Sequence, residues 1–279
     1  MLKLKPNWLR GFVDAEGCFN IHVFKNPSIK IGEQVKLRFI VDQKAVDKAT
    51  LQDIGNYFGG GSLNLYSKDC AQIVVSKQDL IFNNIIPFFN NYPLLTNKRN
   101  DFENWSRCAE LIKNKAHLTV DGLVQIQDIK NLMNNKSFPS PDLNIDLPED
   151  WVTGFIEGDG NFYLSVQDIA EDKIKLEPRL EVGLHSIDKH ILEGLNRFFN
   201  DKGRINESGQ YPHWSIRGIK NSYDYVIPFF DKHPLVTIKK SKEYLIWKEA
   251  VILAQNKEHL TSSGATRIRE IKKELSRKP

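Results

Sequence analysis

The chain carries one nine-residue pattern twice, and this repeat constrains its fold more than any other feature. The first copy, LRGFVDAEG, begins at Leu9 and the second, VTGFIEGDG, begins at Val152. Each copy reads apolar, any residue, Gly, Phe, apolar, acid, small, acid, Gly. A long-range repeat of this kind predicts two copies of one structural unit in a single chain.

Three further blocks recur in the same order after each copy of the pattern. They are IPFF at 86–89 and 227–230, PLLTNK at 93–98 with PLVTIK at 234–239, and NKAHLT at 114–119 with NKEHLT at 256–261. The segment 134–148 between the copies is polar and interrupted by prolines, which is typical of a linker. We therefore expect an N-terminal half over 1–133 and a C-terminal half over 149–279.

The apolar periodicity changes in the same order within each half. The nine-residue motif has helical spacing and ends at a glycine, a frequent helix stop. Apolar and polar residues then alternate, which predicts a pair of antiparallel strands. A helix over 46–58 or 187–199 follows, then a second hairpin around glycines 59–61 or residues 202–203, then amphipathic helices. The sequence predicts an α+β fold of two αββαββα halves, with helices on the apolar face of each sheet.

The other face of each predicted sheet is rich in amides, guanidinium groups and other hydrogen-bonding side chains. A merely solvated face is one interpretation, but such groups also read base edges, and a β-surface fits the major groove. We expect Arg38, Arg179 and Arg217 to contact guanine. Strand parity predicts these DNA-binding residues: Cys18, Asn20, His22, Phe24, Gln34, Lys36, Arg38, Ile40, Asp42, Ser62, Asn64, Tyr66, Gln72, Val74, Ser76, Asn161, Tyr163, Ser165, Gln167, Lys175, Glu177, Arg179, Glu181, Arg204, Asn206, His213, Ser215 and Arg217. Two unlike sheets predict a long, non-palindromic site.

Small residues lie four apart in each motif: Gly11 with Ala15, and Gly154 with Gly158. Residues with this spacing share one helix face, so another backbone is able to approach closely there. Helix–sheet packing would use such a stripe, but its repetition favours packing of the two motif helices on each other.

Glu16 and Asp159 stand at the C-terminal ends of the motif helices, where the helix dipole disfavours anions. Packing the helices in parallel would also bring the two carboxylates together. A divalent cation removes both costs, because carboxylate and water oxygens are the ligands of Mg²⁺. Metals held in this way promote phosphodiester hydrolysis. Asp14 and Glu157 point roughly 200° away around the helix, and we interpret them as caps or structural partners.

The two motifs, the linker position and the repeated blocks together resemble the LAGLIDADG homing endonucleases in their single-chain, two-motif form. The resemblance covers nearly the whole chain. It implies that the antiparallel sheets form a DNA-binding saddle, with the two motif helices packed at the interface. It also implies a functional monomer that makes a metal-dependent double-strand break with short 3′ overhangs. Mg²⁺ is the implied cofactor, and Mn²⁺ or Ca²⁺ are able to occupy its sites.

The resemblance also implies roles for individual residues. Glu16 and Asp159 match the metal-binding, catalytic acids, and the carbonyl groups of Ala15 and Gly158 match further metal ligands. Gln43, Lys98 and Lys239 match residues that order water and stabilise the transition state, with Lys240 as the alternate to Lys239. Solvated charge or a phosphate contact is the other interpretation of the lysines. Leu184, next to His185, departs from the pattern at the position opposite Gln43, which puts equal nicking of the two strands in doubt.

Two other functions use the same scaffold: an intron RNA maturase, and a DNA-binding regulator without chemistry. Relatives that have abandoned cleavage often lack a motif acid, and this chain retains both. The formal charge is only +4 and the pI about 8.8, so charge alone does not prove a nucleic-acid partner.

The remaining composition bears on the cellular environment. The three cysteines form no CxxC pair, which favours a reducing compartment. No apolar run reaches the length of a membrane span, and the first residues are too short and too charged for a signal peptide. Richness in Asn, Lys and Ile, with the family resemblance, predicts an organelle-encoded protein of a fungal mitochondrion.

Overall fold

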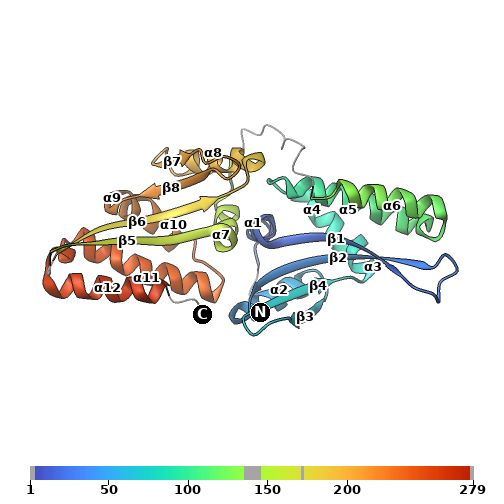
Figure 1. Ribbon diagram of the computed structural model, residues 1–279, viewed down its shortest axis with the longest axis horizontal. Coiled ribbons are helices and arrows are strands. Elements are labelled where there is room, and N and C mark those ends of the chain that lie inside the picture. The colour runs from blue at the N-terminus through green and yellow to red at the C-terminus, as the bar shows by residue number, and fades with distance from the viewer. Residues whose placement is uncertain (1–3, 135–145, 171–172, 277–279) are drawn as a thin grey trace. The chain divides into compact units, whose positions relative to one another are not determined.

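The computed structural model describes residues 4–134, 146–170 and 173–276, and the chain forms two compact units, Met1–Pro141 and Asp142–Pro279 (Figure 1). The division between the units falls inside the predicted linker, most of which, residues 135–145, lies outside the described residues. Each unit is described below by itself.

The first unit begins with the motif helix and continues into a four-stranded antiparallel sheet of order β1-β2-β4-β3. Its elements are α1 (Pro6–Glu16), β1 (Gly17–Lys25), β2 (Glu33–Lys44), α2 (Lys48–Tyr57), β3 (Ser62–Leu65), β4 (Cys70–Val75), α3 (Gln78–Leu80), α4 (Ile86–Asn91), α5 (Lys98–Lys113) and α6 (Val120–Leu132). A π-helical turn, Ile81–Ile85, joins α3 to α4.

The second unit repeats this order with a sheet β5-β6-β8-β7. Its elements are α7 (Glu149–Asp159), β5 (Gly160–Ala170), β6 (Lys173–Gly183), α8 (Lys189–Phe198), β7 (Gly203–Asn206), β8 (His213–Arg217), α9 (Ile219–Asn221), α10 (Ile227–Lys232), α11 (Ile238–Gln255) and α12 (Ser262–Ser276). The predicted α+β class and the doubled αββαββα order are confirmed. No described helix is long and apolar enough to cross a bilayer.

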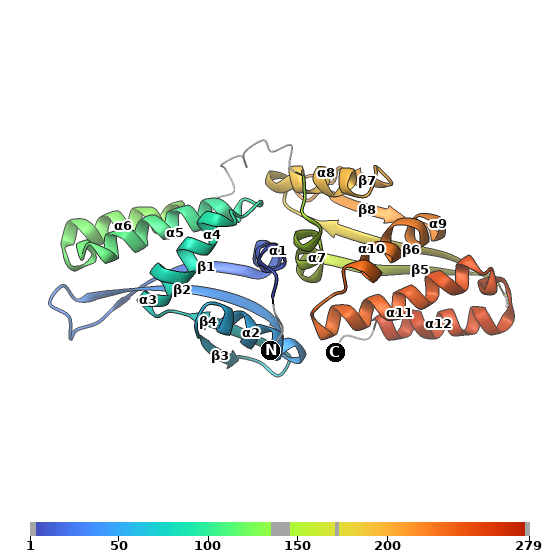
Figure 2. The same cartoon turned by 180° about the vertical axis from the view of Figure 1, so that it is seen from behind.

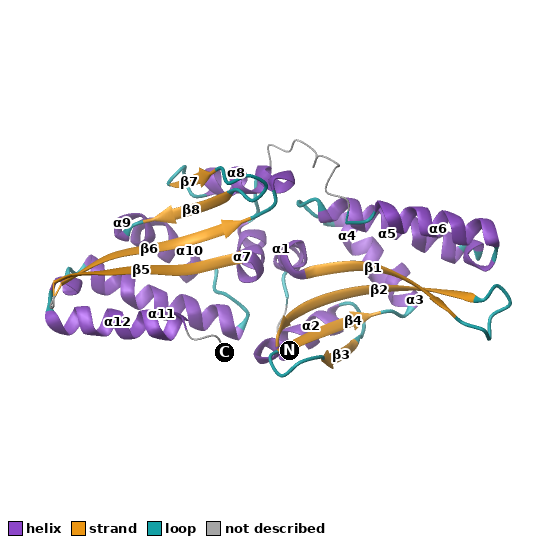
Figure 3. Cartoon of the chain, viewed as in Figure 1, coloured by secondary structure: helices purple, strands orange, loops and turns teal. Residues whose placement is uncertain are grey.

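In each unit the strands lie side by side and the helices pack against one face of the sheet (Figures 2 and 3). In the first sheet, Phe19 pairs with Phe39 across β1 and β2, and both are buried. The ring of Phe19 also contacts those of Phe89 and Trp105, so α4 and α5 are joined to the sheet through aromatic packing. In the second sheet Phe162 makes the corresponding contacts with Phe230 and Trp247, on α10 and α11. The period-2 pattern therefore separates core from polar face as predicted.

Each motif helix passes into the following strand at a glycine. The predicted reason was an ordinary helix stop, but Gly17 has φ −78° and ψ 153°, which is extended rather than left-handed backbone. A Cβ at Gly17 would lie 2.4 Å from Val13 Cγ1 and 2.8 Å from the Val13 oxygen. At Gly160 an added Cβ would lie 2.6 Å from the Ile156 oxygen. Close approach of helix and strand, not a left-handed turn, therefore requires these glycines.

The glycines at 59–61 do not form the turn of the second hairpin, which corrects that prediction. Gly59 and Gly60 have φ of 89° and 140° and end α2, where the Gly60 N–H donates to the Gly55 oxygen at 2.8 Å. In the second unit, Asn200 and Asp201 adopt the left-handed conformation at the corresponding point. Glycine marks helix ends and hairpin turns alike, so the sequence did not separate the two.

The repeated NKxHLT blocks form the turns between α5 and α6 and between α11 and α12. The Thr119 hydroxyl accepts a hydrogen bond from the Gly122 N–H at 3.1 Å, which caps α6. Thr261 and Gly264 make the same contact at 3.2 Å. A Cβ at Gly122 would lie only 1.9 Å from the Ala116 oxygen. These blocks therefore form helix caps and turns.

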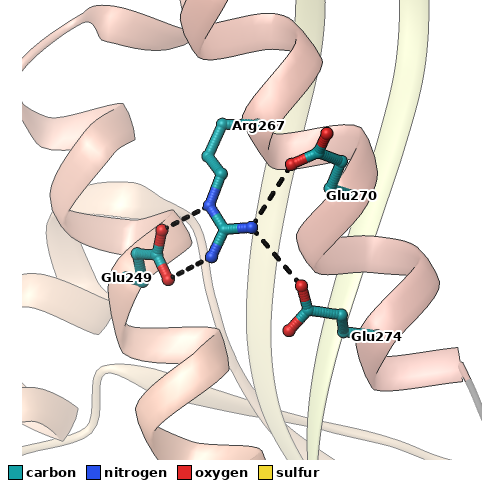
Figure 4. Close-up of polar contacts among 4 residues, drawn as sticks. All are labelled: Glu249, Arg267, Glu270 and Glu274. Carbon is teal, nitrogen blue, oxygen red and sulfur yellow. Dashed lines mark hydrogen bonds and ion pairs between the residues drawn. The ribbon is translucent and has the colours of Figure 1, made fainter.

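An arginine on α12 also links α12 to α11 (Figure 4). Arg267 donates to both carboxylate oxygens of Glu249, at 2.7 and 2.9 Å, and through Nη1 to Glu270 and Glu274 at 3.3 Å. A bidentate guanidinium–carboxylate pair within a network holds its geometry better than isolated surface ion pairs do.

Candidate active site and nucleic-acid interface

The two acids of each motif lie in different environments. Asp14 is 3% exposed, and its carboxylate accepts hydrogen bonds from the Leu95 N–H at 3.1 Å and from the Thr96 N–H and hydroxyl at 3.0 and 2.7 Å. In the second unit the buried Glu157 accepts from the N–H groups of Val236 and Thr237 at 2.9 and 2.6 Å. The predicted structural role of these acids is confirmed, and the repeated PLxT blocks supply their donors.

Glu16 and Asp159 are the last residues of α1 and α7, and their side chains are half-buried and exposed, respectively. Gln43 lies near the end of β2, and its Nε2 donates to Glu16 Oε1 at 3.4 Å, a long hydrogen bond. The structure therefore brings together Glu16 and Gln43, which are 27 residues apart in the chain.

Lys98 reaches the end of α1 from the start of α5. Its Nζ donates to the Val13 and Ala15 oxygens at 3.0 and 2.9 Å. The last carbonyl groups of a helix lack intrahelical partners and carry the negative end of its dipole, so an ammonium group is stabilised there. One helix end therefore brings together Glu16, the Ala15 carbonyl, Gln43 and Lys98. The sequence named these four groups but did not show that they make contact.

The second unit places Lys240 in a related position. Lys240 is 7% exposed, and its Nζ donates to the Gly160 oxygen at 2.6 Å, just beyond the end of α7. Lys239, the residue first predicted for this role, forms an ion pair with Glu243 at 3.5 Å, and Lys240 forms one with the same carboxylate at 3.2 Å. The alternate lysine is therefore the one that donates to the Gly160 carbonyl, and a catalytic role for Lys239 stays a prediction.

The second unit differs at the position opposite Gln43. The Leu184 N–H donates to the Pro212 oxygen at 3.2 Å, but its apolar side chain has no polar group to offer an acid. The neighbouring His185 accepts the Ile187 N–H on Nδ1 at 3.3 Å and stacks edge-on against Tyr211. His185 therefore caps a helical turn, and the two units are chemically unequal at this position.

The oxygen atoms at each motif helix end are of the type that binds a hard divalent cation. A carboxylate and the preceding carbonyl group stand on consecutive residues, Ala15 with Glu16 and Gly158 with Asp159. Mg²⁺ commonly takes one or two carboxylates and completes its shell with water. Within the described ranges, three or more His, Cys, Asp or Glu side chains do not gather at one point.

The residues predicted from strand parity lie on the face of each sheet that is not the core, apart from Tyr66 and Ser76, which directly follow β3 and β4. With one exception the predicted residues are exposed or half-buried. The exception is Ser215, which is 2% exposed and whose hydroxyl accepts from Arg217 Nε at 2.8 Å. This burial argues against direct DNA contact by Ser215. Strand parity predicted the correct sheet face for Ser215, but it did not predict the hydrogen bond from Arg217.

Polar contacts on the sheet faces hold several of these side chains. Arg38 donates to Asn20 across β1 and β2 at 2.9 and 3.1 Å, and Asn161 donates to Glu181 at 2.9 Å. Desolvation, followed by the charge of the Asp42 carboxylate, raises the pKa of Tyr66 to about 12. Tyr66 therefore stays a neutral hydrogen-bond donor over the physiological pH range.

A family model described as LAGLIDADG endonuclease matches residues 9–109 and 152–251 of this chain. The chain belongs to the LAGLIDADG endonuclease family. The two matched regions each begin at a motif and extend into α5 or α11. They include both motif acids, Gln43 and the three lysines discussed above.

Similar proteins include several named as probable intron-encoded endonucleases. The chain is 32% identical over 304 aligned positions to "Probable intron-encoded endonuclease 2" of Neurospora crassa, covering 98% of this chain and 65% of that relative. Among solved structures, I-SmaMI bound to uncleaved DNA with calcium ions has a TM-score of 0.89 at 26% identity, covering 99% of this chain and all of that one. I-LtrWI bound to target DNA has a TM-score of 0.86 at 33% identity, covering 96% of each chain.

Proposed function

We propose that this LAGLIDADG chain is a site-specific endonuclease that cuts both strands of a long, non-palindromic duplex with divalent metal ions. One observation carries the proposal. Each unit ends its motif helix in an acid, Glu16 or Asp159, and places a lysine amine on backbone carbonyl groups at or just after the helix end. A regulator that only binds DNA needs neither acid. The I-SmaMI and I-LtrWI structures named above are complexes with DNA, which supports the same substrate.

The residues at the helix ends divide the work of phosphodiester hydrolysis. Glu16 and Asp159, with the carbonyl groups of Ala15 and Gly158, would hold Mg²⁺, which when bound activates water and polarises the phosphate. Gln43 orients the Glu16 carboxylate through its amide. Lys98 and the Lys239–Lys240 pair supply positive charge for the negative charge that develops on the phosphate oxygens.

The polar sheet faces would bind the duplex, and their different residues would make its two halves unlike. The product carries short 3′ overhangs, and one chain with two units acts as a monomer. Fungal relatives, among them a probable intron-encoded endonuclease and a mitochondrial protein of Saccharomyces cerevisiae, support expression in a fungal mitochondrion, as does the richness in Asn, Lys and Ile.

Cleavage selection from a randomised duplex library with Mg²⁺ tests the proposal, with Glu16→Gln and Asp159→Asn run alongside. We expect the parent to select and cut one long site and neither variant to cut it. If the parent binds a discrete site but never cuts it, in Mg²⁺ or Mn²⁺, the chain is a regulator. If it selects no DNA but binds intron RNA, it is a maturase.

A further inference from the structure

Arg179 and Arg217 lie directly opposite each other on neighbouring strands of the second sheet. They are cross-strand partners in the register of β6 with β8, and both are half-buried on the polar face. Like charges at directly opposed positions repel and lower the stability of a sheet. The Glu177 carboxylate forms an ion pair with Arg179 and offsets part of this repulsion. A ligand with acceptor atoms would offset the rest.

Each of these arginines is held by its Nε atom. Arg179 Nε donates to the Glu177 carboxylate, two residues earlier on the same strand, and its guanidinium lies 5.5 Å from the centre of the Tyr163 ring. Arg217 Nε donates to the buried hydroxyl of Ser215. Within the described part of the chain, neither guanidinium group forms a hydrogen bond other than the one at Nε. Both terminal amino groups of each fork therefore remain as donors.

The arginine of the first sheet is arranged differently. Arg38 donates hydrogen bonds from Nε and from one terminal amino group to the same oxygen of Asn20, its cross-strand partner on β1. Its fork is therefore partly occupied, and its cross-strand partner on β1 is an amide rather than a second arginine. The two forks on β6 and β8 are a feature of the second unit.

We infer that Arg179 and Arg217 read guanines on two adjacent base pairs, and that Glu177 and Ser215 are positioning residues for them. The inference rests on the proposed DNA-binding function. Opposed residues on antiparallel strands lie about 4.5–5.5 Å apart at Cα, and base pairs stack at about 3.4 Å. Two long side chains from such positions reach neighbouring base pairs. The terminal amino groups of arginine match the O6 and N7 acceptors of guanine in the major groove.

The Nε contacts explain why acidic Glu177 lies on a face that binds a polyanion. Anchoring the guanidinium before binding reduces the freedom that is lost when DNA is bound. Glu177 is also able to accept from a cytosine amino group. In that case its replacement would change the preference at a base pair that Arg179 does not read.

The test is selection for binding, not cleavage, from a randomised duplex pool with the full chain in Ca²⁺. The parent is compared with Arg179→Lys, Arg217→Lys, Glu177→Gln and Ser215→Ala. Lysine keeps the charge and removes the fork, so each lysine variant should lose roughly 10-fold of its discrimination at one guanine and keep the rest of the site. Glu177→Gln should weaken the preference for the same guanine that Arg179→Lys affects. Ser215→Ala should weaken the preference for the same guanine that Arg217→Lys affects. Arg197→Lys, on the exposed side of α8, is the matched control and should change nothing.

A thermal melt of each variant separates base reading from folding, because a purely structural role lowers the midpoint without changing base preference. The inference is wrong if Arg179→Lys and Arg217→Lys weaken binding equally for all sequences, or if the guanines they read are not adjacent. It is also wrong if Glu177→Gln changes a different base pair from Arg179→Lys. A parent that selects no DNA at all overturns the proposed function as well.

Discussion

At the scale of single residues, the two acids of one motif should contribute unequally to stability. Asp14 satisfies three buried donors, so Asp14→Asn should cost about 1–3 kcal/mol of unfolding free energy, as should Glu157→Gln in the second unit. Glu16→Gln removes an anion from a helix C-terminus and should change stability by less than about 0.5 kcal/mol while abolishing cleavage. Urea unfolding followed by tryptophan fluorescence, with a cleavage assay, checks both. Equal destabilisation by Asp14→Asn and Glu16→Gln would contradict the division of roles.

At the scale of elements, the junction between α1 and β1 is sterically closed. An added Cβ at Gly17 meets the Val13 oxygen at 2.8 Å, a backbone atom that moves only with the helix. We expect Gly17→Ala to cost about 1–3 kcal/mol and to slow cleavage, because Glu16 stands next to the displaced residue. Gly160→Ala should act in the same way in the second unit. A Gly17→Ala protein with the stability and cleavage rate of the parent would show that the junction relaxes freely.

The turns between α5 and α6 and between α11 and α12 should make the stability of the protein depend on pH. Burial lowers the pKa of His117 and of His259 below the ordinary value of 6.5, and Nδ1 of each is buried without a hydrogen-bond partner among the described residues. The unfolded chain binds these protons more readily, so their contribution to stability is complete above about pH 6.5 and is lost as the pH falls below it. Denaturation at about pH 7.5 and 5.5 should show a smaller difference for the His117→Gln, His259→Gln double variant than for the parent. An unchanged difference would assign the pH dependence to other groups.

At the scale of the whole molecule, the sequence predicts the elements that recur in both units. It does not predict features that depend on side chains that are neighbours only in the folded chain. The antiparallel strand pairs and the polar face follow from half-buried strands, whose period of two is visible in the residues. The different burial of Asp14 and Glu16 follows from their separation around a helix. Lys239 and Lys240 were not separated, because consecutive lysines stand where the alignment of the repeats drifts by one residue. Ser215 is buried and hydrogen-bonded to Arg217, and strand parity predicts neither the burial nor the contact.

The two units differ at the position of Gln43, and this difference should affect how the two DNA strands are cut. Glu16 has the Gln43 amide beside it, whereas the corresponding position in the second unit is the apolar Leu184. If the amide orders the acid and its water, the two strands should be cut at different rates. Nicked circles should then accumulate before linear product when a supercoiled plasmid carrying the selected site is cleaved in a single turnover. Gln43→Leu should slow the faster strand, and Leu184→Gln should shorten the lifetime of the nicked circle. Linear product without a nicked intermediate from the parent would show that Gln43 gives its strand no advantage.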